Sequence, residues 1–343
     1  LVRMAVAKAA LVEPLQQFAL PVKHSALIVG GGVAGLEAAL GVAEQGYQAH
    51  LVEKTGELGG VARKLRTTWK GEDIPSYVDA LAERVKDHPL VDVHMSTEVK
   101  EFSGTVGNFV TTLQGTDGSK APPMIEHGVT ILATGGREYQ PTEYLYGRNP
   151  NVFTHLDLDK ALKEDESRVG EAGTAAFIQC VGSRIPERPY CSKICCTHSL
   201  ESAVKLKKLN PDMKVFILYR DLRSYGFRED LYREARERGV LFIRYDPDNP
   251  PEVAETAEGG LSLVVKDHVL QRDVRISPDL LVLASAILPN ENKALFELLK
   301  VPANNEVFLI EAHAKLRPVD LSSEGLFIAG LAHYPKPLEE TIA

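Results

Sequence analysis

A glycine-rich turn near the start of the chain constrains the fold more than any other feature. A short apolar run, Ala26 to Val29, precedes the turn, and a proline-free, helix-forming run begins at Leu36. Gly30, Gly32 and Gly35 fit the pattern G-x-G-x-x-G. In such a turn the first glycine permits a tight bend, the second lets a pyrophosphate approach the backbone, and the third lets helix and strand pack closely. The phosphates then bind the free N–H groups and the positive end of the helix.

An acidic residue completes this unit. A second apolar run, Ala49 to Val52, leads into Glu53, which stands 18 residues after Gly35. A carboxylate at this place accepts hydrogen bonds from the hydroxyl groups of a ribose. A glycine triplet alone also closes ordinary strand–helix joints. Strand, triplet, helix, strand and acid together predict a Rossmann-like dinucleotide-binding unit.

Composition and charge narrow the class of protein. Of the 343 residues, 44% are hydrophobic and 25% charged, which is typical of a globular protein long enough for two domains. The net charge of −8 argues against nucleic acid or an anionic membrane as a partner. The longest apolar run carries Glu37, so we expect no membrane span. Leu1 to Leu15 faintly resembles a secretory signal, but Lys8 interrupts its apolar core, and we expect a connecting helix and a cytoplasmic protein.

A second α/β pattern occupies roughly residues 170–285. Its strands are predicted at the apolar runs 175–181, 214–219, 240–243 and 280–284, and its helices at 200–209 and 230–238. A final apolar run, 326–330, returns to the first unit. Only Gly182 follows the first strand of the second pattern, so the glycine fingerprint is not repeated there. We therefore do not predict nicotinamide binding by the second unit.

Three further segments resemble the two-dinucleotide-binding-domain flavoproteins of the disulfide-reductase type. They are Glu53 to Gly60 with its paired glycines, Val129 to Gly135 ending in Ala-Thr-Gly, and Gly325 to Gly330. The resemblance implies that the first unit binds FAD and that the second unit is inserted into it, as in thioredoxin reductase. One departure is Leu331, which stands where most members carry Asp.

This resemblance gives the expected α/β domain organisation and the expected contacts. We predict a connecting helix in 1–21, an FAD-binding domain formed by 22–160 and 286–343, and an inserted NAD(P)-domain-like domain over 161–285. The expected FAD contacts are Gly30, Gly32, Val33, Ala34, Gly35, Glu53, Lys54, Gly59, Gly60, Val61, Val99, Ala133, Thr134, Gly135, Gly330, Leu331, Pro337 and Leu338.

All four cysteines lie within 17 residues, as Cys180, Cys191, Cys195 and Cys196. Four interpretations are open. Adjacent cysteines suit an iron–sulfur cluster, since they can bind different irons of one cube. They suit a single zinc ion badly, because neighbouring thiolates would have to span one edge of its tetrahedron. A redox disulfide lacks C-x-x-C spacing here, and four buried free thiols are the remaining interpretation.

The surroundings of these cysteines resemble the A subunit of heterodisulfide reductase. The segments that carry the resemblance are Gln179 to Arg184, Pro189 to Cys196, Ile217 to Asp221 and Leu316 to Asp320. The resemblance covers essentially the whole chain. It implies an FAD-containing component of an anaerobic electron-transfer complex, whose four cysteines hold a [4Fe–4S] cluster. The implied partners are other redox subunits of heterodisulfide reductase, ferredoxin or hydrogenase type, and a homodimer is an open option.

The departures from this family limit what can be transferred. After the last strand, Gly330-Leu-Ala-His333 stands for Gly-Cys-Ala-Gln, and Pro335-Lys-Pro-Leu338 for Pro-Lys-Asp-Ile. The ferredoxin-like cysteines of the family are absent, so electron bifurcation is left open. Lys336 is retained, and we hypothesise that it lies in the first turn of a helix aimed at the flavin ring, where its cation tunes the flavin; a solvated lysine is the alternative.

Two functional classes remain, with a third less favoured. The chain either passes electrons between FAD and the cluster or holds both as structural parts of an assembly. A free-standing NAD(P)H-dependent disulfide reductase is disfavoured by the missing second fingerprint. We expect His155, His198, His313 and His333 to be surface or capping residues rather than ligands. We expect Arg220, Asp221 and Arg223 to form a solvated turn, with a phosphate site as the alternative.

Overall fold

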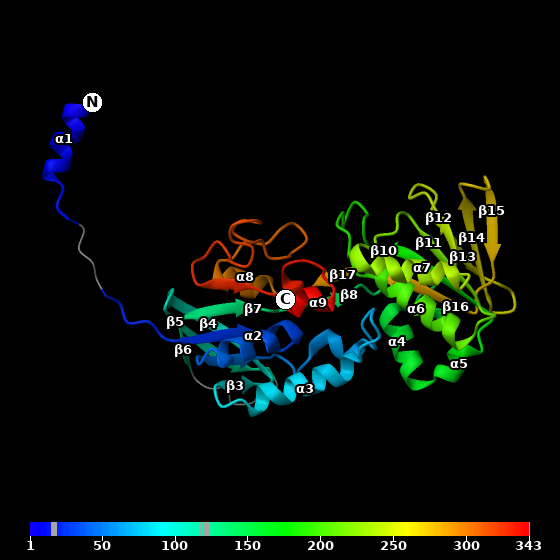
Figure 1. Cartoon of the computed structure of the whole chain (residues 1–343), viewed down its shortest axis with the longest axis horizontal. Helices are drawn as coiled ribbons and strands as arrows, with labels where there is room; N and C mark the ends of the chain where they lie inside the picture. The colour runs from blue at the N-terminus through cyan, green and yellow to red at the C-terminus, as the bar shows by residue number, and fades with distance from the viewer. Residues whose placement is uncertain (15–18, 117, 119–123, 343) are drawn as a thin grey trace.

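The computed structural model describes residues 1–14, 19–116, 118 and 124–342. Two parallel sheets, each with its own helices, lie at opposite ends of the main body (Figure 1). The first sheet has the order β18-β7-β1-β2-β3. Its strands are β1 (Ser25–Val29), β2 (Gln48–Val52), β3 (Val91–His94), β7 (Val129–Leu132) and β18 (Leu326–Ile328). The fold is therefore α/β, as predicted.

The glycine turn joins β1 to the first covering helix of this sheet. The helices α2 (Val33–Glu44) and α3 (Ile74–Asp87) pack on it through a shared apolar core that includes Leu36, Leu40 and Val78. Burial of these side chains is what holds the two helices to the sheet. An antiparallel sheet made of β4 (Thr97–Thr105), β5 (Asn108–Gly115) and β6 (Ile125–His127) follows β3. Gly107, at φ +85°, makes the turn between β4 and β5.

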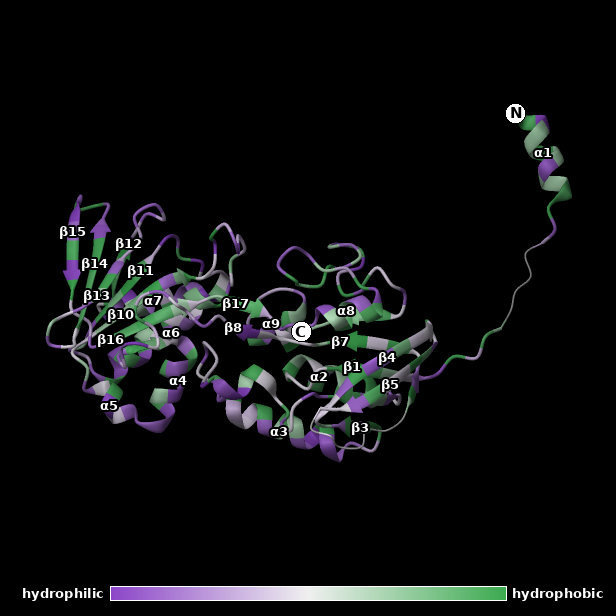
Figure 2. Cartoon of the chain, turned by 180° about the vertical axis from the view of Figure 1, so that it is seen from behind, coloured by the Kyte–Doolittle hydropathy of each residue, from purple (hydrophilic) through white to green (hydrophobic). Residues whose placement is uncertain are grey.

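The second parallel sheet has the order β12-β11-β10-β16-β9. Its strands are β9 (Val152–Thr154), β10 (Thr174–Val181), β11 (Lys214–Tyr219), β12 (Leu241–Arg244) and β16 (Leu280–Ser285). Its helices are α4 (His155–Glu164), α5 (Glu166–Gly170), α6 (Cys195–Leu209) and α7 (Glu229–Glu237). Hydrophobic residues concentrate on the central strands β10 and β16 (Figure 2), which are buried almost throughout because helices or a second sheet cover both faces.

The second unit begins before residue 161, the position expected from the sequence. β9 pairs in parallel with β16, Val152 opposite Leu281 and Thr154 opposite Leu283, and α4 follows it directly. A strand of three residues between polar loops carries little periodicity, so sequence pattern alone does not assign it. A small antiparallel sheet, β13 (Glu252–Glu255), β14 (Leu261–Asp267) and β15 (Arg272–Ile276), covers one face of this unit.

Two strands connect the units, and the chain ends against the cleft between them. β8 (Gly136–Glu138) pairs with β17 (Ile287–Pro289) where the chain leaves and re-enters the first unit. After β17 come α8 (Lys293–Leu299), the 3-10 helix η3 (Gly330–Ala332) and the short α9 (Leu338–Ile342). Two further 3-10 helices, η1 (Gly60–Lys64) and η2 (Gly226–Arg228), lie earlier in the chain. The expected N-terminal helix is present as α1 (Val2–Leu11), which is exposed and stands apart from the main body (Figure 1); Leu15, its expected end, lies outside the described residues. No described helix has the length and apolar content needed to span a bilayer.

Candidate functional site

A cleft of about 1640 Å³ lies between the two parallel sheets and is the candidate site. Its volume exceeds the 300–1,000 Å³ typical of a pocket for one small ligand. It gathers sixteen of the eighteen predicted FAD contacts: Gly30, Gly32, Val33, Ala34, Glu53, Lys54, Gly59, Gly60, Val61, Val99, Ala133, Thr134, Gly135, Leu331, Pro337 and Leu338. The other two, Gly35 and Gly330, do not line the cleft.

Each glycine of the turn has a different steric situation. A side chain at Gly30, which has φ +113°, would collide with the Ala133 carbonyl 2.3 Å away, and one at Gly35 with the Gly30 carbonyl at 1.8 Å. A side chain at Gly32 would meet nothing within 4 Å, because that side of the turn faces the cleft. The first intrahelical bond of α2 runs from Leu36 N–H to the Gly32 carbonyl. The N–H groups before Leu36 therefore have no partner within the helix and are available to an anion.

Glu53 is already engaged within the protein. It is 9% exposed, and its carboxylate accepts hydrogen bonds from Gly31 N–H at 2.7 Å and from Thr55 N–H at 2.8 Å. The carboxylate thus fixes the glycine turn against the end of β2. Two carboxylate oxygens offer about four acceptor positions, so a ribose hydroxyl can still be accepted.

Lys336 lies in the cleft, but the expectation that it occupies the first turn of a helix is wrong. α9 begins two residues later, at Leu338, because Pro337 disfavours the helical conformation in the residue before it, which is Lys336. The ammonium of Lys336 lies 4.3 Å from the centre of the Tyr334 ring, and burial lowers the pKa of this lysine. It is therefore a partly desolvated cation on the cleft wall.

The four cysteines gather at the carboxyl end of β10. Cys180 lies on β10, while Cys195 and Cys196 open α6; these three are buried and Cys191 is partly buried. All four thiols are free. The hydrogen bond of Cys195 to Cys196, its burial and the other three thiols raise the pKa of Cys195 well above the usual value. The sulfur of Cys196 accepts a hydrogen bond from Cys195, and its pKa falls to about 7.

Several features around the cysteines favour bound thiolates. Arg184 Nη1 lies 3.8 Å from Cys180 Sγ, and Arg223 lies next to Cys196, so two arginines flank the thiols. Cys180, Arg184 and Lys193 all have positive φ, between 57° and 64°. Such strain in non-glycine residues is concentrated at functional sites. No group of three or more His, Cys, Asp or Glu side chains among the described residues is arranged around a single ion, whereas a cube spreads its thiolates over four irons.

The far wall of the cleft contains titratable groups that the sequence does not reveal. His155 and His198, expected to be surface or capping residues, are largely buried there and stack with ring centres 4.3 Å apart. His155 packs near Phe177 of β10, and His198 pairs with Asp159 of α4, so contacts between residues distant in sequence bury both rings, which a local pattern cannot indicate. Two carboxyl groups, Glu138 and Glu201, line the same wall. The only signal in the sequence was that Glu201 follows Cys195 at a helical spacing, which would place both on one face of a helix.

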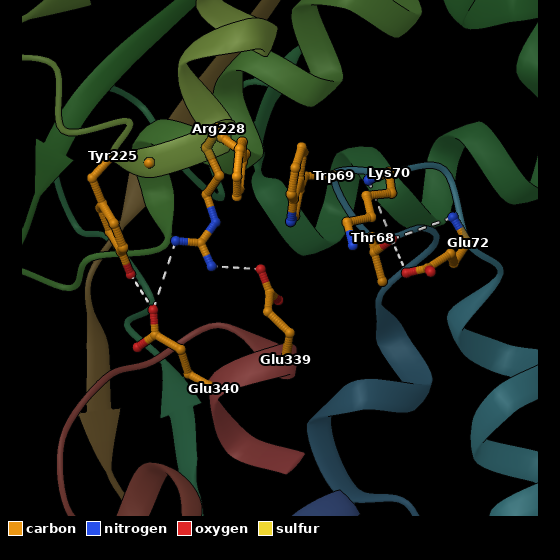
Figure 3. A pocket seen from close by; sticks show the side chains of 10 residues that line it. Thr68, Trp69, Lys70, Glu72, Tyr225, Arg228, Glu339 and Glu340 are labelled. Atoms are coloured by element: carbon orange, nitrogen blue, oxygen red, sulfur yellow. Dashed lines mark hydrogen bonds and ion pairs between the residues drawn. The ribbon is translucent and has the colours of Figure 1, made fainter. Parts of the chain in front are cut away.

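A smaller cavity of about 300 Å³ opens beside the mouth of the cleft (Figure 3). The buried Arg228 side chain lies there over the Tyr225 ring and pairs with Glu339 and Glu340 of α9. Tyr225 also donates its hydroxyl to Glu340. These contacts join the second unit to the C-terminal segment that lines the cleft.

Comparison with known proteins finds relatives that align over the whole chain. The model of a family described as FAD dependent oxidoreductase matches residues 26–113. The A subunit of H(2):CoB-CoM heterodisulfide,ferredoxin reductase from Methanothermobacter marburgensis is 30% identical, covering 100% of this chain and 65% of the relative. The iron-sulfur A subunit of CoB–CoM heterodisulfide reductase from Methanocaldococcus jannaschii is 31% identical, covering 100% and 66%. Both alignments run over 436 positions, more than the 343 residues here, so the relatives contain inserted segments that this chain lacks.

Solved structures agree on the fold. Thioredoxin reductase of Lactococcus lactis superimposes with a TM-score of 0.62 at 15% identity, covering 93% of this chain and 94% of that one. Thioredoxin reductase of T. acidophilum gives 0.59 at 14% identity with the same coverage. The chain spans about 65% of the length of the curated relatives it matches. Over its whole length the chain is similar to heterodisulfide reductase A subunits, its residues 26–113 match the FAD dependent oxidoreductase family, and its fold is that of thioredoxin reductase.

Proposed function

We propose that the chain is an FAD-binding electron-transfer subunit that passes electrons between the flavin and a [4Fe–4S] cluster. The observation that carries the proposal is that Cys195 lines the same cleft as the glycine turn. A flavin held by that turn and a cluster held by the four cysteines would then be neighbours. FAD accepts two electrons or one, whereas a cluster passes them singly, so the pair converts between the two modes.

The residues of the chain would hold the flavin in three ways. The free N–H groups at the start of α2 and the open face of Gly32 suit a pyrophosphate. Glu53 orients the turn and has acceptor capacity left for a ribose. Lys336 supplies a cation where reduced flavin would gain negative charge.

The cysteine segment offers the cluster what four thiolates need. Neighbouring arginines and the first turn of α6 oppose the rise in thiol pKa that burial causes, and three of the four thiols are buried. Names of relatives include the words iron-sulfur and ferredoxin, which supports a redox partner of that class.

Absorption spectroscopy under anaerobic conditions tests this function. The purified protein should show flavin bands and a broad cluster band, and dithionite should bleach both. Rapid bleaching of the flavin by NADH alone would contradict the proposal and favour an NAD(P)H-dependent disulfide reductase. Bands that no reductant bleaches would favour a structural role in an assembly.

A further inference from the structure

The cleft wall that faces the glycine turn carries titratable side chains that are not among the proposed contacts to the flavin. One face of α6 presents Cys195, His198 and Glu201 to the cleft, at spacings of three residues, which places them along one stripe of a helix. The stripe runs from the cysteine segment to the loop that precedes α3. Glu138 of β8 approaches the same wall from the strand that connects the two units.

Glu201 is an acid that pairs with no basic side chain of the described residues. Its only hydrogen bond among the described residues runs from the hydroxyl of Thr67, which belongs to the first unit. Within the same residues no Lys, Arg or His nitrogen lies within ion-pair distance of its carboxylate. Around it are His198 on its own helix, Asp159 on α4 and Arg66 beyond Thr67. Burial outweighs these influences and raises the pKa of Glu201 to about 7.

Glu138 is in a similar situation. Its carboxylate accepts hydrogen bonds from the Thr154 hydroxyl at 2.8 Å and from Leu156 N–H at 3.5 Å. The nearby charges are Asp157 on α4, which repels a carboxylate, and His198, which attracts one. Burial again dominates and raises the pKa of Glu138 to about 7.

The two histidines between these acids are not suited to exchange a proton near neutral pH. His198 is paired with Asp159 at 3.1 Å and stays charged, since that carboxylate raises its pKa to about 9. His155 contacts Ser199 at 2.8 Å and is held neutral, because burial and the neighbouring His198 cation lower its pKa. On this wall it is therefore the two carboxyl groups that exchange a proton readily near neutral pH.

We infer that Glu201, assisted by Glu138, is a proton donor to the cofactor reduced in the cleft. This inference rests on the proposed function, because the recipient is the flavin. Full reduction of oxidised flavin to its anionic form consumes two electrons and one proton. A low-potential iron–sulfur donor supplies the electrons singly through the cluster. The Glu201 carboxyl supplies the proton and stays a carboxylate in the reduced protein until the flavin is reoxidised.

Redox-difference infrared spectroscopy at pH 7 tests the proton transfer directly. On reduction of the flavin-loaded protein, the C=O band of a protonated carboxyl group should be lost in the wild type. Glu201→Gln should lack this lost band, and Glu138→Gln should diminish it. Glu291→Gln is the matched control, because Glu291 borders the same cleft but is 90% exposed and paired with Arg137. Its spectrum should match the wild type.

The pH dependence of the flavin potential supplies a second readout. In the wild type the curve should bend near pH 7, and in Glu201→Gln the bend should disappear. Normal flavin content with an unchanged carboxyl band and an unchanged curve in Glu201→Gln would overturn the proton-donor role and leave the FAD proposal intact. Absence of flavin from the anaerobic wild type would overturn the proposed function, and the proton donor with it.

Discussion

The carboxyl ends of β1 and β10 are equivalent places in two similar sheets, yet they differ completely in chemistry. At the end of β1, residues 30–32 turn the chain directly into α2, and glycines leave the backbone open to a phosphate. At the end of β10, residues 182–194 separate the strand from α6, and cysteines crowd the junction. In both units the cleft lies outside the carboxyl ends of parallel strands, where α/β folds bind ligands. The comparison teaches that the fold determines where a ligand binds, whereas the residues of the loop between strand and helix determine which ligand it is.

The largest expected effect comes from a cysteine variant, which should remove the cofactor at the end of β10 and leave the one at the end of β1. Cys195→Ser should reduce iron from about four atoms per chain to fewer than one, because a cube needs all of its thiolates in a buried site. Flavin content should stay unchanged. Thr197→Val is the control on the same helix and should retain its iron. Iron and sulfide at wild-type levels in Cys195→Ser, measured by chemical analysis of anaerobic protein, would show that the junction does not bind a cluster.

The reciprocal variant acts on the glycine side. Gly32 has an ordinary φ of −74° and free space beside it, so Gly32→Val should fold normally but block the approach of the pyrophosphate. We expect flavin-free protein that still contains iron. Gly41→Ala, in the helix that follows the turn and equally free of steric contact, should retain flavin. Full flavin occupancy of Gly32→Val, read from its absorption spectrum, would refute the assignment of the turn.

A third variant tests how the two units are held together. Arg228→Met removes the buried guanidinium that pairs with α9 and should lower the free energy of unfolding by about 2 kcal/mol, the range for hydrogen bonds to charged groups. Arg233→Met, which removes an exposed pair with Asp230, should change it by less than about 0.5 kcal/mol. Chemical denaturation compares the two. Equal values would mean that this contact does not stabilise the interface.

The smallest effect concerns the tuning of the flavin. Lys336→Ala should lower the two-electron potential of the flavin while leaving FAD bound, because the reduced ring loses a neighbouring cation. A partly buried charge of this kind contributes on the order of 1 kcal/mol. Lys160→Ala, on the opposite wall with an exposed ammonium, should leave the potential unchanged. A redox titration of Lys336→Ala that superimposes on the wild type would make Lys336 an ordinary surface residue.

Local patterns were sufficient for the parts of the site that are contiguous in sequence. The glycine turn, Glu53 and the central strands could be predicted because their spacing follows from backbone geometry. The strand β9 and the burial of His155 could not, because each depends on contacts with residues more than forty positions away. The acid pair Glu138 and Glu201 shows the same limit, since only the folded chain brings β8 and α6 to one wall.

The stoichiometry of cofactors in anaerobically purified protein tests the central claim most directly. If the two junctions bind different redox cofactors, each chain should contain about one FAD, four irons and four sulfides. Iron and sulfide should be lost together in Cys195→Ser, and flavin alone in Gly32→Val. One zinc per chain without sulfide, in protein that was never exposed to oxygen, would contradict the account.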